Sequence, residues 1–63
     1  MKKVTRNNLI RLVYMKKNYQ KTGNQEILEK INNFTENVIN KDKRYYHKLK
    51  SYDLPSEMLA YLV

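Results

Sequence analysis

The single glycine of the chain, Gly23, separates two segments in which apolar residues recur at the spacing of an α-helix. Glycine readily adopts the left-handed backbone conformation that ends many helices. After it, either Thr22 with Gln25 as a capping box or Asn24 alone can cap the next helix. The sequence therefore predicts a helix over about residues 5–21, a turn at 22–24 and a helix over about 25–40. Together these elements form an antiparallel helical hairpin.

The first of these helices is apolar around most of its circumference. Leu9, Leu12 and Val13 belong to one broad face, while Ile10 and Tyr14 lie on its flank. A helix with so wide an apolar surface needs cover on more than one side. We therefore expect it to be either the central element of a bundle or half of a dimer interface.

The second half of the chain allows two interpretations. The apolar stripe of the second helix could continue through Tyr45 and Leu49 as one long helix, or break at the polar run 40–43. With a break, a helix over about 42–52 follows, and Pro55 opens a short helix over about 55–63. The predicted fold is all-α. It is one domain, residues 1–63, in which the hairpin is extended to a small three- or four-helix bundle that could dimerise.

Little of the chemistry that catalysis or cofactor binding needs is present. The 63 residues include no cysteine and one histidine, which excludes disulfides, thiolate zinc sites and histidine-rich metal sites. That histidine, His47, lies among tyrosines and a lysine, as expected of a solvated surface residue. A single glycine cannot form a phosphate-binding loop. The sequence predicts a protein that is not an enzyme and uses no cofactor, metal or small-molecule substrate.

Basic residues outnumber acidic ones by 13 to 6, giving a net charge of +7, and they fall into two blocks. The acidic start of the second helix separates these blocks. The first block is Lys2, Lys3, Arg6, Arg11, Lys16, Lys17 and Lys21, and the second is Lys41, Lys43, Arg44, Lys48 and Lys50. If the third segment folds back beside the first, the blocks form one stripe able to neutralise several phosphates. All of these residues except Lys21 are candidate nucleic-acid-binding residues.

Tyrosines are interleaved with the basic residues at Tyr14, Tyr19, Tyr45, Tyr46 and Tyr52. Aromatic rings beside lysine or arginine can stack on unpaired bases. Tyrosines at helical spacing can equally pack into a core with the hydroxyl at its rim. The sequence leaves both roles open.

Residues 23–41 can also be interpreted as a helix-turn-helix. Asn33 would take the left-handed turn position, Phe34 would be the buried turn residue, and Thr35 would cap a recognition helix. With its Gly23-Asn24-Gln25 start, the segment resembles bacterial helix-turn-helix modules of the recombination-enhancer type. The resemblance implies contact with DNA. A continuous amphipathic helix explains the same residues with fewer assumptions.

These observations favour a small regulatory protein that binds nucleic acid. The alternative is a protein-binding regulator or inhibitor, for example phage- or plasmid-encoded, that uses an apolar helical face and could act as a homodimer. The candidate interface residues are Ile10, Tyr14, Tyr45, Tyr46, Leu59 and Leu62. Membrane attachment is least favoured, because the chain lacks tryptophan and its asparagines are evenly spread. With no signal peptide or membrane span evident, we expect a cytoplasmic protein.

Overall fold

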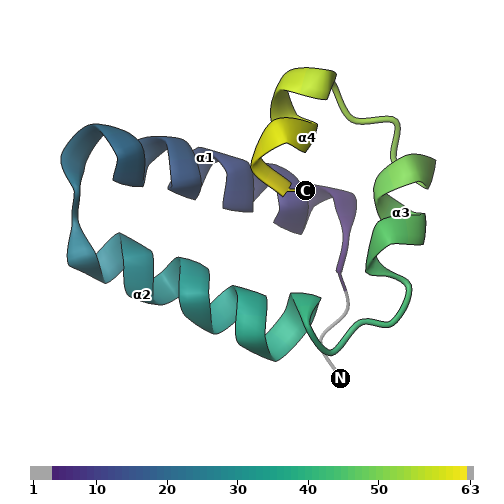
Figure 1. Ribbon diagram of the computed structural model, residues 1–63, viewed down its shortest axis with the longest axis horizontal. Helices are drawn as coiled ribbons and strands as arrows, with labels where there is room; N and C mark the ends of the chain where they lie inside the picture. The colour runs from purple at the N-terminus through teal and green to yellow at the C-terminus, as the bar shows by residue number, and fades with distance from the viewer. Residues whose placement is uncertain (1–3, 63) are drawn as a thin grey trace.

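The computed structural model describes residues 4–62, in which four α-helices and no strands occur. The helices are α1 (Arg6–Thr22), α2 (Gln25–Phe34), α3 (Tyr45–Ser51) and α4 (Ser56–Leu62), and η1 (Thr35–Ile39) continues α2 as a π-helix. Figure 1 shows α1 and α2 side by side as an antiparallel hairpin, with α3 and α4 completing the bundle. The predicted all-α fold is confirmed. Val63, placed by the sequence at the end of the last helix, lies outside the described residues.

Local chemistry defines the turn of the hairpin. Gly23 has a φ of 66°, and its N–H donates to the carbonyl of Tyr19 at 2.7 Å. The side chain of Asn24 accepts a hydrogen bond from the N–H of Glu26 at 2.9 Å, so this residue is the N-cap of α2. Thr22 instead donates its hydroxyl back to Asn18 within α1. Of the two predicted caps, Asn24 is the one that the structure uses.

No turn interrupts the chain between Gln25 and Ile39, so the helix-turn-helix interpretation is wrong. Asn33 lies inside α2, and Asp53 is the one non-glycine residue of the described chain with a positive φ. The hydroxyl of Thr35 donates to the carbonyl of Ile31 at 2.8 Å instead of capping a new helix. The apolar stripe of α2 continues unbroken into η1, and burying it outweighs any tendency of Asn33 to form a turn.

The core is built around α1, which is covered on several sides. Leu9, Leu12 and Val13 are completely buried. The other buried apolar residues come from every remaining part of the chain: Val4, Ile31, Val38, Tyr45, Leu49, Leu54 and Leu62. The wide apolar surface of α1 is therefore covered within one chain, as a central bundle element requires. It supplies no argument for a second subunit, and dimerisation stays a prediction.

The bundle has two layers. Its principal extents are 31 × 27 × 16 Å, and the shortest leaves room for two layers of helices about 10 Å apart. The hairpin is one layer, and α4 packs against α1 from the other. Figure 1 places α3 at the end of the bundle where α1 begins. There the hydroxyl of Tyr52 donates to the carbonyl of Val4 at 3.0 Å.

Candidate nucleic-acid interface

The structure divides the first basic block into structural and exposed residues. Lys16 donates from Nζ to the carbonyl of Tyr61 at 2.6 Å, and burial lowers the pKa of this lysine. Lys17 pairs with the carboxylate of Glu57 at 3.1 Å, and this hydrogen bond raises the pKa of Lys17. Both lysines therefore fasten α4 to α1. Exposed on α1 are Arg6, Arg11 and Lys21, whereas Lys2 and Lys3 lie outside the described residues.

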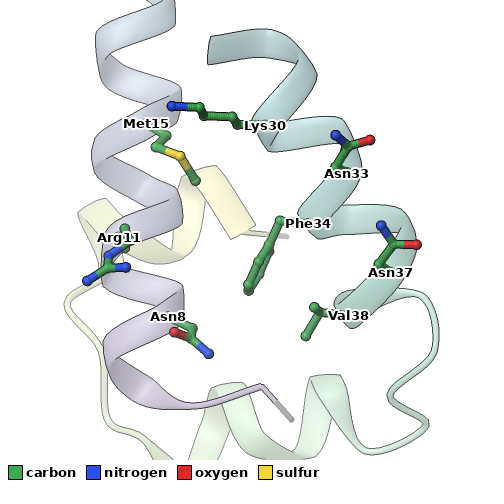
Figure 2. Close-up of a pocket in the computed structure, with 8 residues that line it drawn as sticks. All are labelled: Asn8, Arg11, Met15, Lys30, Asn33, Phe34, Asn37 and Val38. Carbon is green, nitrogen blue, oxygen red and sulfur yellow. The ribbon is translucent and has the colours of Figure 1, made fainter. Parts of the chain in front are cut away.

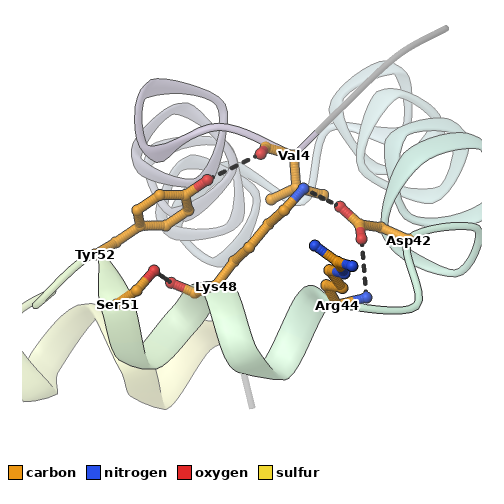
Figure 3. Close-up of polar contacts among 6 residues, drawn as sticks. All are labelled: Val4, Asp42, Arg44, Lys48, Ser51 and Tyr52. Atoms are coloured by element: carbon orange, nitrogen blue, oxygen red, sulfur yellow. Dashed lines mark hydrogen bonds and ion pairs between the residues drawn. The ribbon is translucent and has the colours of Figure 1, made fainter.

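One lysine of the second block is also structural. Lys48 binds Oδ2 of Asp42 at 2.6 Å, and both side chains are largely buried. The hydrogen bond from Lys48, followed by that from the backbone N–H of Arg44, lowers the pKa of Asp42 (Figure 3). This pair closes the turn before α3, which begins at Tyr45 instead of the predicted residue 42. The remaining basic residues of the block, Lys41, Lys43, Arg44 and Lys50, are exposed.

The outward side of α1 is a continuous polar and basic stripe. Its exposed residues recur at spacings of three and four: Asn7, Arg11, Tyr14, Asn18 and Lys21. No acidic residue occurs between positions 4 and 25, so nothing on α1 offsets the positive charge. Glu26, Glu29 and Glu36 are instead exposed along α2 and η1. The two helices of the hairpin therefore present opposite charges to solvent.

Two tyrosine side chains are exposed on the described surface. Tyr14 is 58 % exposed and Tyr46 is 70 % exposed, and they are the large hydrophobic side chains that the core does not cover. The ring of Tyr14 has the ammonium group of Lys17 at 6.0 Å from its centroid. Tyr46 shares a hollow of about 340 Å³ with Lys43. Each exposed ring therefore belongs to one basic block.

Two of the predicted interface residues are core residues. Tyr45 is 6 % exposed and Leu62 is 7 % exposed, and the tyrosine hydroxyl donates to the leucine carbonyl at 2.8 Å. Burial raises the pKa of Tyr45. Neither residue can contact a partner in this conformation, so both are withdrawn as interface candidates. Ile10 and Leu59 are half-buried against the core, and Tyr14 and Tyr46 are accessible.

The sequence did not predict a groove that runs between α1 and α2. It encloses about 470 Å³ and is lined by Asn8, Arg11, Met15, Lys30, Asn33, Phe34, Asn37 and Val38. Figure 2 shows Phe34 and Val38 directed into the space between the helices, with α4 behind α1. The positions of Lys30, Phe34 and Asn37 repeat at helical spacing, and this is the sequence signal that could have indicated this surface.

No family model, curated protein or solved structure matches this chain. Within residues 4–62, no three histidine or acidic side chains come together as a metal site would require. No helix in the same range is both long and apolar enough to cross a lipid bilayer.

Proposed function

We propose that the protein is a nucleic-acid-binding regulator that takes a single strand on the outward side of α1 and on the exposed basic residues next to α3. The observation that carries this proposal is that the two exposed tyrosines, Tyr14 and Tyr46, each lie within a basic block. Proteins that bind single strands combine cations that follow the backbone with aromatic rings on which bases stack.

A single strand is favoured over a duplex because of how the charged residues are presented. The helix-turn-helix that would enter a major groove is absent, since residues 25–39 form one continuous helical stretch. An exposed ring can stack only on a base whose face is accessible, which a duplex does not offer. The acidic outer side of α2 and η1, with Glu29 and Glu36, repels phosphate and confines the strand to α1 and α3.

The salt dependence of binding has a magnitude that follows from the exposed cations. For single strands, each phosphate contact contributes about −0.7 to the slope of log K against log salt. Contacts by Arg6, Arg11 and Lys21 alone give a slope of about −2. Adding the four exposed cations of the second block gives about −5. The measured slope therefore reveals whether one or both blocks engage the same strand.

Fluorescence anisotropy with labelled oligothymidylate and oligouridylate, across a range of salt concentrations, tests the proposal. Replacing Tyr14 with alanine should weaken binding by about 1–3 kcal/mol, the contribution of one stacked base. Tyr14→Phe is the matched control, because it keeps the ring and should bind like the wild type. Circular dichroism of both variants verifies that their helices are intact.

A second pair of variants separates local contacts from net charge. Lys21→Gln and Lys30→Gln remove the same charge, one from the outward side of α1 and the other from α2. Only Lys21→Gln should reduce the slope, by about 0.7. Absence of binding to either oligonucleotide at low salt refutes the proposal, as does equal weakening by the two glutamine variants.

A further inference from the structure

The groove between α1 and α2 has the composition of a docking surface for a helix. Its apolar lining is Met15, Phe34 and Val38. Lys30 extends from α2 toward Met15, and Arg11 lies at the α1 edge with its side chain directed away from Phe34 (Figure 2). None of the described residues that line it is acidic. An apolar centre with a polar and charged rim is the usual anatomy of a specific interface.

The groove has the length of a short helix. On α1 it extends from Asn8 to Met15, seven residue steps of about 1.5 Å, or about 10 Å. That length accommodates about two helical turns. A helix of this size already covers the other face of the hairpin, since α4 consists of seven residues, Ser56–Leu62.

The contacts of α4 show how this hairpin holds a helix. Leu62 packs into the core, and Lys17 binds the carboxylate of Glu57 at 3.1 Å. Lys16 binds the carbonyl of Tyr61 near the C-terminal end of α4. An apolar anchor in the core, together with α1 cations that bind one carboxylate and one backbone carbonyl, therefore holds this helix. The open groove also combines apolar side chains with cations, Arg11 from α1 and Lys30 from α2.

From this combination of apolar and basic lining residues we infer that the groove binds an acidic amphipathic helix of a partner protein. Leucine-like side chains spaced by three and four residues would lie on Met15, Phe34 and Val38. Aspartate or glutamate on the flanks of that helix would face Arg11 and Lys30. This surface is distinct from the proposed nucleic-acid face and shares only Arg11 with it.

Charge complementarity favours this occupant over the two alternatives. A second copy docked groove to groove would place Arg11 and Lys30 against the same cations, which is unfavourable in a symmetric interface. A nucleic acid would satisfy the cations but would leave the apolar lining exposed to phosphate and sugar. Only a ligand that is both apolar and acidic matches the apolar lining and the cations together.

Two labelled peptides of about 18 residues, long enough to be partly helical in water, test the inference. One has leucine at spacings of three and four with glutamate on both flanks, and its match has lysine in place of every glutamate. Fluorescence anisotropy measures their binding to the full chain. We expect saturable binding of the acidic peptide and none of the basic one.

Two charge reversals, each tested against both the peptide and the oligonucleotide, show which surface binds the acidic peptide. In about 0.15 M salt, where charges more than about 8 Å apart are largely screened, Lys30→Glu should weaken the acidic peptide about tenfold and change oligonucleotide binding by less than about twofold. Lys21→Glu, on the outward side of α1, should do the reverse. The two proposals can therefore fail independently.

Several results would overturn the inference. Equal affinity for the acidic and basic peptides excludes recognition by charge, and equal weakening by the two reversals shows diffuse attraction. Displacement of the acidic peptide by oligothymidylate, together with loss of both ligands in Lys30→Glu, assigns the groove to nucleic acid. If light scattering shows that the protein is a dimer and that the acidic peptide dissociates it, the groove binds a second copy instead.

Discussion

Replacing Tyr45 tests whether this residue belongs to the core or to a partner surface. Tyr45→Phe removes one hydrogen bond, the 2.8 Å contact with the carbonyl of Leu62, and should cost about 0.5–1.5 kcal/mol. Tyr45→Ala also removes the buried ring, and such truncations cost about 3–5 kcal/mol. A chain of this length is stabilised by about 3–9 kcal/mol in total. We therefore expect Tyr45→Phe to stay folded and Tyr45→Ala to lose most of its stability.

Urea unfolding followed by far-ultraviolet circular dichroism measures both effects. For a small domain the free energy falls by about 1 kcal/mol per molar urea, so Tyr45→Phe should lower the midpoint by about 1 M. The exposed neighbour gives a matched control: Tyr46→Ala should change the stability by less than about 0.5 kcal/mol. If Tyr45→Ala unfolded at the same urea concentration as the wild type, the placement of this ring in the core would be wrong.

The pH dependence of the same pair offers an independent test. Burial raises the pKa of Tyr45, so the folded protein holds this proton more tightly than the unfolded chain does. The resulting stabilisation is complete below the unfolded pKa of about 10 and is lost as the pH rises through the folded pKa. The difference between wild type and Tyr45→Phe should therefore shrink in alkaline solution. A difference that grew with pH would contradict the assigned shift.

Four further substitutions test the turns. Asn24→Ala should lower the unfolding free energy by about 1 kcal/mol, whereas Gln25→Ala should lower it by less than about 0.5 kcal/mol. Equal losses of stability in urea would favour the capping box of Thr22 and Gln25 over Asn24 as the cap. Gly23→Ala should cost about 1–2 kcal/mol because the φ of 66° is unfavourable for alanine, although the added methyl group meets no atom within 4 Å. Asp42→Asn should destabilise the protein at neutral pH and less so in acid. The pKa of Asp42 is lowered in the folded protein, so its carboxylate stabilises the fold above about pH 4, and this stabilisation is lost as the pH falls. An acid titration of urea midpoints in which the two proteins never converge would contradict the role of the Asp42–Lys48 pair.

The hairpin could be predicted from sequence because its determinants are local. Gly23 and Asn24 have conformational and hydrogen-bonding preferences that act within a few residues, and the structure uses both. The choice between a turn and a helix at Asn33 was harder, since that residue tolerates either backbone conformation. The stripe formed by Ile31, Phe34 and Val38 decided it, because burying these side chains requires the helix to continue.

The site was less predictable because contacts between distant residues define it. Lys17 and Glu57 are 40 positions apart, and no local pattern shows that this lysine holds α4 while Arg11 stays exposed. Tyr45 and Tyr46 are neighbours in a basic block, yet one is 6 % and the other 70 % exposed. Their difference depends on which side of α3 faces α1 and α4, and that is a property of the assembled bundle.

The division of cations between structural and exposed positions has a consequence for the remaining surface. Since Glu57 and Asp42 neutralise Lys17 and Lys48, these four residues add little to the field outside the protein. What remains is a positive side along α1 and a negative side along α2, rather than a uniform excess of positive charge. A uniform excess would serve solubility alone, whereas a polarised surface orients an approaching polyanion before contact. For this reason Glu29→Gln should strengthen oligonucleotide binding at low salt, although residue 29 does not contact the strand. The gain in affinity should disappear at high salt, which screens the field.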